Sequence, residues 1–291
     1  TTIFKGNPTM ANKPILIIGK SGKTGHRVNQ RLLDMGLNTR AVSRSTDLPF
    51  DWEDRETWPA ALKGVASVYV TYQPDLAIPQ AASDIEAFVT LARQSGLEHI
   101  VLLSGRGETG AEKAEEIVQS SGLEWNIVRA SWFFQNFSES FMIEGILAGE
   151  LVLPAGDTLE PFIDAEDIAE VVVTTLTQKQ YRNRVYELTG PRAMSFSEAM
   201  KELSIALQRE VKYTQVPVDA YINALEEEGV TKQMQWLLRE LFTEVLDGRN
   251  SQLQSGVEEV LGRQATDFRV YLKRTVDSGY WRVDEQKLVN L

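Results

Sequence analysis

The chain has 291 residues, of which 43% are hydrophobic and 24% charged, and its formal net charge is −11. This is globular composition with enough apolar material for a sizeable core, and the acidic balance disfavours nucleic acid as a direct partner because phosphate binding needs a basic face. No run approaches the roughly 20 apolar residues of a membrane-spanning helix, so we expect no membrane span. Cysteine is absent, which excludes disulfides and cysteine-ligated metals.

The N-terminal residues and the histidines carry little functional information. Residues 1–12 lack the apolar segment of a signal peptide, and we expect them to be a disordered leader or an expression remnant. His26 and His99 stand far apart in the sequence, so a histidine-based metal site is not expected. These features favour a cytoplasmic protein without a bound metal.

The first half of the chain alternates short β-rich runs with longer helical stretches, which is the pattern of a parallel sheet with crossover helices. The run at residues 14–18 is apolar throughout, as expected for a strand buried on both faces. Strands are expected at residues 14–18, 38–43, 67–71, 99–103 and 125–129, and helices at residues 25–35, 79–95 and 111–120. The pattern predicts an α/β fold with a parallel sheet flanked by helices.

The second half is more helical. Ser195 followed by Glu198 has the pattern of a capping box, which predicts a helix beginning there. A helix is expected at residues 164–177, strands at residues 185–188 and 211–216, and helices from residue 217 onward. We therefore expect a sheet domain over residues 13–155 and a smaller, mostly helical lobe over residues 156–291 whose strands return to the sheet.

A glycine-rich turn, Gly-Lys-Ser-Gly-Lys-Thr-Gly, joins the first strand to the first helix. In this spacing the first glycine allows a tight turn, the second lets the backbone approach a pyrophosphate, and the third lets the helix pack on the strand. The helix N-terminus adds free N–H groups and a partial positive charge. The context predicts a Rossmann-type domain that binds a dinucleotide through Gly19, Ser21, Gly22, Lys23, Thr24 and Gly25.

Two alternatives to dinucleotide binding apply to this turn. Residues 21–24, Ser-Gly-Lys-Thr, also resemble the end of a P-loop, but that motif needs a glycine five positions before Gly22. Ile17 occupies that position inside the first strand, which disfavours nucleoside triphosphate hydrolysis. The other alternative is a strand–helix turn without a ligand.

The end of the second strand indicates which nicotinamide cofactor is bound. NAD-binding domains usually place Asp or Glu there for the ribose 2′-hydroxyl, whereas NADP-binding domains place Arg nearby for the 2′-phosphate. Here the residues are Ala41-Val42-Ser43-Arg44-Ser45, and no carboxylate appears until Asp47. Arg44 can bind a phosphate through two parallel hydrogen bonds, which favours NADP(H) over NAD(H). The alternative is that Arg44 is a solvated surface residue.

Several further motifs accompany the glycine turn and the Arg44 segment. They are Phe50-Asp-Trp-Glu-Asp54, Val101-Leu-Leu-Ser104, Ser121-Gly-Leu-Glu-Trp-Asn-Ile-Val-Arg129, Trp132-Phe-Phe-Gln-Asn-Phe137, Leu153-Pro-Ala-Gly156, Pro161-Phe-Ile-Asp-Ala-Glu-Asp-Ile168, Tyr186-Glu-Leu-Thr-Gly-Pro191 and Ser195-Phe. With these motifs the chain resembles the NmrA-like branch of the atypical short-chain dehydrogenases. It is most similar to the ergot-alkaloid-type (agroclavine dehydrogenase-like) reductases and their bacterial relatives. The similarity runs from Pro14 to about Trp281.

The resemblance implies a Rossmann core of seven or eight strands, a small C-terminal substrate lobe and NADP(H) at the glycine turn. It implies that the cofactor is lined by Thr71, Tyr72 and Gln73 after the third strand. Ser104 would lie near the nicotinamide, and residues 132–137 would run along the cofactor and substrate cleft. Members of the family are either reductases of quinones, dyes, imines or enones, or cofactor-sensing regulators without turnover.

The usual proton donor of short-chain dehydrogenases, a Tyr-x-x-x-Lys pair, is missing, because none of the eight tyrosines has Lys four residues later. Hydride transfer needs no side-chain acid when the acceptor takes its proton from water. Ser104 and Lys113 are the candidate catalytic residues. The alternatives are that Ser104 is a strand-end hydroxyl bonded to backbone and that Lys113 lies on a solvated helix face.

The candidate substrate-binding residues are Trp132, Phe133, Phe134 and Asn136, because an aromatic run suits a flat conjugated molecule stacked beside nicotinamide. The same run is equally typical of a core segment. Asp164 and Asp167 are expected to cap the helix that follows them.

These observations predict an NADPH-dependent reductase of a small conjugated, quinone- or imine-type substrate. The alternatives are an NADP(H)-binding redox-sensing regulator without turnover and an isomerase or epimerase on the same fold. We expect a small-molecule substrate, no direct nucleic-acid or membrane partner, and a monomer or homodimer.

Overall fold

The computed structural model describes residues 13–282, so the predicted leader at residues 1–12 lies outside the described residues. The described residues cluster into two compact units. Unit 1 contains residues 13–105, 109–129 and 168–186, and unit 2 contains residues 106–108, 130–167 and 187–282. The division into domains that the sequence suggested, with a boundary after residue 155, stays a prediction.

A six-stranded sheet with the order β2-β1-β3-β4-β5-β7 forms the centre of unit 1. Its strands are β1 (Ile15–Ile18), β2 (Thr39–Val42), β3 (Ser67–Val70), β4 (His99–Gly105), β5 (Glu124–Ala130) and β7 (Arg184–Leu188). The pairs β1–β2, β1–β3 and β3–β4 are parallel. Leu16, Ile17 and Ile18 are buried, as predicted for a strand covered on both faces. The predicted α/β fold with a parallel sheet is confirmed.

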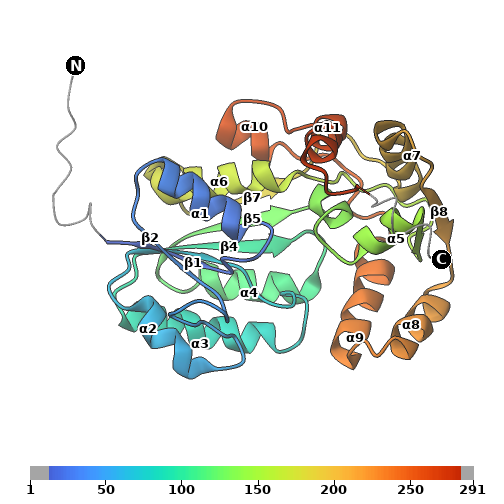
Figure 1. Ribbon diagram of the computed structural model, residues 1–291. Coiled ribbons are helices and arrows are strands. Elements are labelled where there is room, and N and C mark those ends of the chain that lie inside the picture. Colours follow the sequence, from blue (N-terminus) through green and yellow to red (C-terminus); the bar gives the residue numbers. More distant parts are fainter. Residues whose placement is uncertain (1–12, 283–291) are drawn as a thin grey trace, which may run out of the picture. The chain divides into compact units, whose positions relative to one another are not determined.

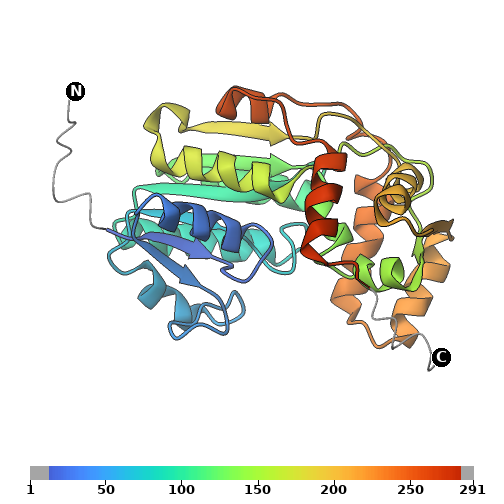
Figure 2. The same ribbon diagram turned by 45° about the horizontal axis from the view of Figure 1, so that its top comes forward.

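Helices cover both faces of this sheet. Figure 1 shows α1 and α6 on one face and α2, α3 and α4 on the other, and the turned view of Figure 2 brings α1 and α6 in front of the sheet. The helices are α1 (Gly25–Asp34), α2 (Trp58–Leu62), α3 (Ala81–Gln94), α4 (Thr109–Gln119) and α6 (Ala165–Thr177), with short 3₁₀ turns η1 (Arg55–Thr57) and η3 (Lys179–Tyr181). Amphipathic spacing explains the packing of α1, since Val28 and Leu32 are buried against the sheet side.

The strand order creates a switch point beside β1. The chain passes from β1 to β2 on one side of β1, and then to β3 on the other side. In open α/β sheets, ligands bind outside the carboxyl ends of the strands at this kind of position. The fold therefore places the candidate cofactor site where the glycine turn leaves β1.

Unit 2 contains the remaining elements. They are η2 (Phe134–Phe137), α5 (Met142–Ala148), β6 (Glu150–Leu153), α7 (Phe196–Leu207), β8 (Lys212–Gln215), α8 (Val218–Glu227), α9 (Lys232–Glu240), the π-helical η4 (Leu241–Val245), α10 (Gly256–Leu261) and α11 (Phe268–Ser278). The predicted capping box is present, because the Ser195 hydroxyl accepts from the Glu198 amide and the Glu198 carboxylate accepts from the Ser195 amide.

The expectation of seven or eight strands in one core sheet is wrong for the described residues. The strands β6 and β8 pair with each other in a separate two-stranded parallel sheet. In β6, exposed Glu150 and Val152 alternate with buried Leu151 and Leu153. Such alternation suits a small sheet with one solvated face, whereas a central strand of the main sheet such as β3 is buried throughout.

Aromatic side chains dominate the core of unit 2. Phe137, Phe162 and Phe196 pack with ring centroids 5.1 to 5.9 Å apart, and Phe268 joins them at 5.7 Å from Phe137. The Trp281 indole N–H donates to the Phe137 carbonyl oxygen at 2.8 Å. This hydrogen bond ties the last described residues to the segment after β5.

The close approach of α1 to the glycine turn predicts a steric penalty at Gly25. A Cβ at Gly25 would lie 2.0 Å from the Gly19 carbonyl oxygen, whereas a Cβ at Gly22 would lie 3.3 Å from the same atom. We expect Gly25→Ala to lower the free energy of unfolding by about 1–3 kcal/mol, the usual cost of overpacking, and Gly22→Ala by less. Urea denaturation of both variants without cofactor checks this, and equal losses would contradict it.

Candidate active site

The turn after β1 closes around Gly19. Its φ of +89° lies in the left-handed region that favours glycine, and its N–H donates to the Val42 carbonyl oxygen at 3.0 Å. A Cβ at Gly19 would lie 2.2 Å from Thr71 Oγ1, and this hydroxyl donates to the Ile18 carbonyl oxygen at 2.9 Å. Because Gly19 ends β1 and Thr71 follows β3, the turn and Thr71 meet at the switch point.

The first turn of α1 provides the groups that can hold an anion. The N–H groups of a helix's first turn have no intrahelical partner, and the helix dipole adds partial positive charge there. Close packing of Gly25 on Gly19 brings this turn against the end of β1. Around it, Ser21 is exposed and Gly22 and Lys23 are half-buried. These predicted cofactor residues therefore lie together and are accessible.

Thr24 differs from the rest of the turn because its side chain is buried. It is 3% exposed, and its hydroxyl accepts a hydrogen bond from Tyr69 at 2.9 Å. Burial raises the pKa of Tyr69, so the phenol stays protonated and remains a donor. Thr24 is thus left with its backbone as the group that can reach a ligand. The role of Tyr69 was not predicted, since only its place within the β3 run could have suggested it.

The loop after β2 presents Arg44 to solvent. The Thr46 hydroxyl accepts from the Ser43 amide at 2.9 Å and donates to the Leu48 carbonyl oxygen at 2.7 Å, which builds a closed turn. Arg44 and Ser45 are exposed on this turn. Within residues 13–282 the Arg44 guanidinium has no hydrogen-bond or ion-pair partner. A free cation beside a serine hydroxyl suits a phosphate group.

The residues after β3 have different environments. Tyr72 is 9% exposed, and its hydroxyl donates to Asp84 Oδ2 at 2.8 Å. Its ring packs on Trp52 at 4.9 Å between centroids, and the Trp52 indole N–H donates to the Thr71 carbonyl oxygen at 3.0 Å. Gln73 is exposed. Tyr72 and Trp52 therefore pack against the segment that contains Thr71. Of the three predicted residues, Gln73 is exposed, Thr71 is half-buried and Tyr72 is buried.

Ser104 lies at the end of β4 in a buried polar group. Its hydroxyl donates to Glu115 Oε1 at 2.6 Å, and the same carboxylate forms an ion pair with Arg129. Because the hydroxyl proton is held by Glu115, Ser104 can accept a hydrogen bond from a ligand but has no free proton to donate. Lys113 is exposed on α4. The structure brings Ser104 together with Glu115 and Arg129, two partners that the sequence motifs did not indicate.

The aromatic segment after β5 belongs to unit 2. Trp132 is half-buried, with its ring 5.8 Å from Phe196 and 5.5 Å from Phe242. Phe133 is half-buried and forms a parallel bridge with Ile163. Both rings are partly accessible to a bound molecule.

The other two predicted substrate residues lie on η2. Phe134 is 1% exposed, and its ring packs 5.0 Å from Phe268 and 5.2 Å from Tyr271. Asn136 is half-buried, and within the described residues its side-chain amide has no hydrogen-bond partner. Phe134 is therefore surrounded by core, whereas the Asn136 amide is available.

A buried carboxylate, which the sequence motifs did not single out, supports this segment. Glu160 is 1% exposed, and its Oε1 accepts from the Trp132 amide at 3.1 Å. Burial raises the pKa of Glu160 to about 7, although the Trp132 amide, the Arg106 guanidinium and the Ser131 hydroxyl each oppose the rise. An acidic residue directly before the apolar residues Pro161-Phe162 was the available signal.

Arg106, whose charge lowers the pKa of Glu160, bonds to several other segments of unit 2. It is 6% exposed and donates to the Ser131 hydroxyl at 2.9 Å and to the Asn250 carbonyl oxygen at 3.0 Å. Its Nε lies 3.3 Å from Glu187 Oε2. One buried guanidinium therefore fixes segments that are far apart in the sequence.

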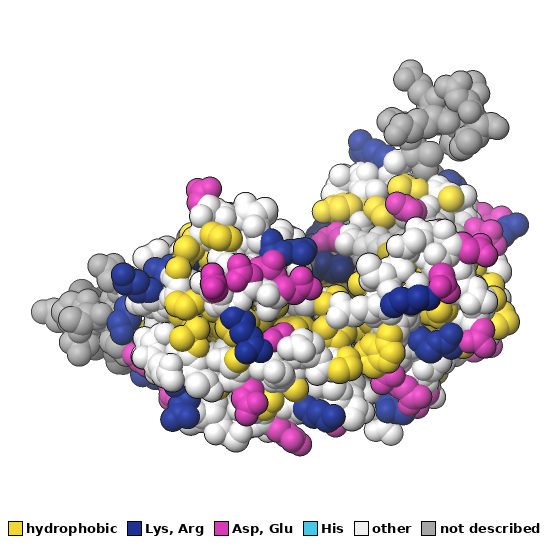
Figure 3. Space-filling view, turned by 90° about the horizontal axis from the view of Figure 1, so that it is seen from below, with side chains coloured by type: hydrophobic (Ala, Val, Ile, Leu, Met, Phe, Trp, Pro, Cys, Tyr) yellow, Lys and Arg dark blue, Asp and Glu magenta, His cyan; other side chains and the backbone are white. Residues whose placement is uncertain are grey.

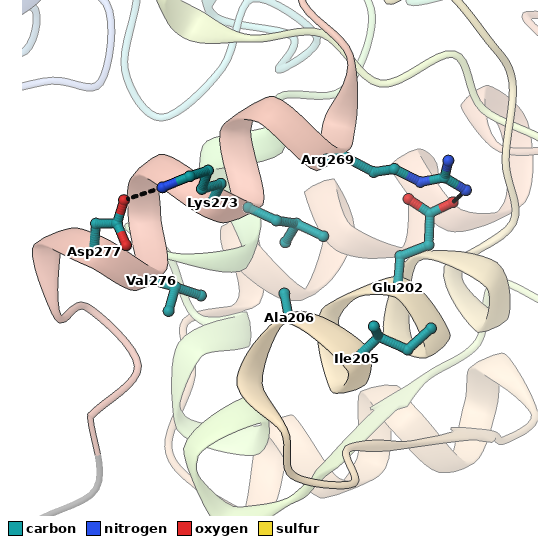
Figure 4. Close-up of a pocket in the computed structure, with 8 residues that line it drawn as sticks. Glu202, Ile205, Ala206, Arg269, Lys273, Val276 and Asp277 are labelled. Carbon is teal, nitrogen blue, oxygen red and sulfur yellow. Dashed lines mark hydrogen bonds and ion pairs between the residues drawn. The ribbon is translucent and has the colours of Figure 1, made fainter.

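A separate groove of about 520 Å³ lies between α7 and α11 (Figure 4). Ile205 on its α7 side is 78% exposed, and the apolar part continues with Ala206 and Val276. Its charged side chains are paired as Arg269–Glu202 and Lys273–Asp277. The groove holds none of the predicted site residues, and its cations already have partners.

The surface charges and the lengths of the helices bear on the possible partners of the chain. Acidic and basic side chains are interspersed on the face shown in Figure 3. Among the described residues, no helix combines the length and apolar character that crossing a bilayer requires. In the same part of the chain, His, Asp and Glu form no group of three or more that could hold a metal ion.

Known sequences align with nearly the whole chain, although no family model matches it. Prestalk A differentiation protein A of Dictyostelium discoideum is 28% identical over 92% of this chain and 94% of its own. The NAD(P)H azoreductase of Xenophilus azovorans is 27% identical over 89% and 96%. Agroclavine dehydrogenase of Claviceps purpurea is 26% identical over 84% and 88%.

Solved structures share the fold. A nucleoside-diphosphate-sugar epimerase from Staphylococcus aureus superposes with a TM-score of 0.77 at 19% identity, covering 89% of this chain and 99% of that one. The NADPH complex of a quinone oxidoreductase from Escherichia coli has a TM-score of 0.74 at 19% identity over 90% and 99%. A mutant NmrA has a TM-score of 0.65 at 16% identity over 92% and 96%.

The resemblance to the NmrA-like reductases is thereby confirmed. The prediction of an oxidoreductase is confirmed with it, because curated relatives over most of the chain carry reductase and dehydrogenase names. This chain combines a glycine turn at the switch point with Arg44 after β2, which has no hydrogen-bond or ion-pair partner within residues 13–282. The roles of its individual site residues stay predictions.

The buried carboxylate predicts a pH-dependent stability. Because the pKa of Glu160 is raised from 4.5 to about 7 in the folded chain, the folded state holds a proton that the unfolded state releases. The stabilisation present below pH 4.5 is lost as the pH rises through 7. We expect a loss of about 3 kcal/mol relative to Glu160→Gln, whose amide does not titrate. Urea denaturation at pH 5 and pH 8 measures it.

The control for this prediction is Glu116→Gln, which changes an exposed carboxylate on α4. Its unfolding free energy should follow the wild-type pH dependence. Parallel curves for wild type and Glu160→Gln would contradict the assignment of the pH dependence to Glu160.

Proposed function

We propose that the chain is an NADPH-dependent reductase of a small conjugated, quinone- or imine-type compound. The observation that supports this most is the close-packed turn of Gly19 and Gly25 at the switch point, together with Arg44, which has no partner within residues 13–282. The azoreductase and the quinone oxidoreductase among the similar proteins use NAD(P)H and NADPH by name. The reductase activity and the NAD(P)H cofactor in these names agree with the predictions from the sequence.

The residues at the turn fit a dinucleotide. A side chain at Gly19 would fill the space beside Thr71, so the backbone there is bare and can approach a pyrophosphate. The N-terminus of α1 would hold the phosphates. Arg44 and Ser45 would hold the 2′-phosphate, and the absence of a carboxylate at the end of β2 disfavours NAD(H).

When bound, NADPH supplies a hydride from its nicotinamide ring. In this proposal Ser104 accepts a hydrogen bond from the cofactor or the acceptor, because its own proton is held by Glu115. Trp132 and Phe133 bind the flat acceptor, and the side-chain amide of Asn136, which has no partner among the described residues, hydrogen-bonds it. Lys113 remains a candidate for binding an anionic group of the cofactor or the acceptor. Phe134 would shape the acceptor site from within the core of unit 2.

The proposal needs no side-chain proton donor. A quinone or iminium group takes up hydride at an electron-poor atom, and water can supply any proton that follows. A plain carbonyl would need an acid in the position of the missing Tyr-x-x-x-Lys tyrosine. Acceptors that are already electron-poor therefore suit this set of residues better than simple ketones.

Calorimetric titration of the purified chain with NADPH and NADH tests the cofactor site. We expect NADPH to bind at least about tenfold more tightly than NADH, since one charge-assisted phosphate contact contributes roughly 1.5–3 kcal/mol. Arg44→Ala should remove this preference, whereas Lys63→Ala, an exposed cation in the same unit, should keep it. Failure to bind either cofactor would refute the proposed function.

Steady-state NADPH oxidation with quinones, azo dyes and cyclic imines tests the role of Ser104. Ser104→Ala should lower kcat/KM about fivefold to tenfold, because one hydrogen bond contributes roughly 1 kcal/mol. Ser120→Ala, at the exposed end of α4, is the matched control and should have no effect. Lys113→Ala tests that residue in the same assay, and wild-type rates in both site variants would remove them from the active site.

A regulator that binds NADP(H) without turnover is the second candidate. The similarity to a protein named for differentiation in Dictyostelium discoideum favours it. It shares the cofactor site, so it predicts the same NADPH titration without oxidation of NADPH by any acceptor.

A further inference from the structure

Trp132 is held by its backbone rather than by its indole. Its amide donates to Glu160 Oε1 at 3.1 Å, and Glu160 is in turn fixed by two backbone hydrogen bonds with Met194, each 3.0 Å long. The ring of Trp132 lies between Phe196 and Phe242 and remains half-buried. The Trp132 carbonyl oxygen also accepts from the Ile163 amide at 2.9 Å, so Glu160 provides the side-chain contact to a backbone that is otherwise held by main-chain bonding.

The charged groups around Glu160 come from two directions. Arg106, after β4, faces it and lowers its pKa, and Glu187 on β7 faces the same guanidinium at 3.3 Å. Ser131, after β5, accepts from Arg106 at 2.9 Å, which leaves its proton for Glu160. The segment of residues 250–252 contributes only carbonyl oxygens to Arg106. When Glu160 is ionised, the charges of Glu160, Arg106 and Glu187 sum to −1. When Glu160 is protonated, they sum to zero.

We propose that Glu160 is a positioning residue for the acceptor site, where its carboxylate holds Trp132 through the Trp132 amide and its protonation loosens that hold. The proposal rests on the proposed function in one respect, namely that Trp132 binds the acceptor. Glu160 touches no ligand, because it is 1% exposed.

The direction of the effect follows from hydrogen-bond strength. An ionised carboxylate accepts from an N–H about twice as strongly as a neutral acid does. Burial raises the pKa of Glu160 to about 7, so the change falls in the neutral range. Trp132 is therefore held more firmly above pH 7 than below it, and the acceptor binds more tightly there.

The first measurement is KM for the acceptor at saturating NADPH between pH 5.5 and 8.5. In the wild type KM should fall about threefold to tenfold as the pH rises through 7, while kcat changes less. Glu160→Gln should show a KM that is independent of pH and close to the wild-type value at low pH. A purely structural role would alter kcat and the amount of folded protein without removing the pH dependence.

Glu187→Gln is the matched control, because it removes the other carboxylate beside Arg106 without touching the Trp132 amide. Its KM should stay pH-dependent, with the midpoint moved to lower pH because Glu160 then faces an uncompensated guanidinium. Loss of the pH dependence in Glu187→Gln together with its retention in Glu160→Gln would overturn the proposal.

A second readout does not require turnover. The difference in tryptophan fluorescence between the wild type and Trp132→Phe isolates the Trp132 signal, which should titrate near pH 7 and lose that titration in Glu160→Gln. If NADPH binds but no acceptor is reduced, the proposed reductase function is refuted. The fluorescence titration then tests by itself whether Glu160 positions Trp132. A pH-independent Trp132 signal, or a pH-independent wild-type KM in an active reductase, overturns the inference.

Discussion

Close backbone packing at the end of β1 is the constraint on which the candidate cofactor site depends. The Gly19 carbonyl oxygen has room for Gly25 only because neither residue has a side chain, and Thr71 fills the remaining space beside Gly19. This packing holds the N-terminus of α1 at the switch point of the sheet, where phosphate groups find free N–H groups. A side chain at Gly19 or Gly25 would push the start of α1 away from the end of β1, and the candidate anion site would be distorted with it.

Unit 2 is organised by a buried ionic cluster in an otherwise aromatic core. Arg106 bonds to Ser131, to Glu187 and to the backbone of Asn250, so it has partners that repay much of its desolvation. Glu160 is less fully compensated, and burial therefore raises its pKa to about 7. A carboxylate kept near its titration point beside Trp132 is a costly arrangement for stability alone. Such perturbed groups occur often at functional sites.

The chemistry available to the chain follows from what its polar side chains already bond. The Ser104 proton is held by Glu115, and Tyr72 donates to Asp84. Tyr69 donates to Thr24 and is buried. These hydroxyls stabilise the unit rather than supply protons. These bonds agree with the absence of Tyr-x-x-x-Lys from the sequence, and they are the reason that the proposed function names acceptors that take hydride without an enzymic acid.

The sequence by itself determined the parallel sheet, the glycine turn, the capping box at Ser195 and the resemblance to the NmrA-like reductases. These features depend on local periodicity, on glycines needed for backbone geometry and on short motifs, all of which are visible along the chain. The sequence could not show that β6 and β8 pair outside the main sheet, because pairing between strands far apart in the sequence leaves no local signal. Only the tertiary structure showed that Thr24 and Phe134 are buried and that Ser104 is bonded to Glu115. It alone brought Arg106, Ser131 and Glu160 together, because burial and charge pairing arise from contacts between distant segments.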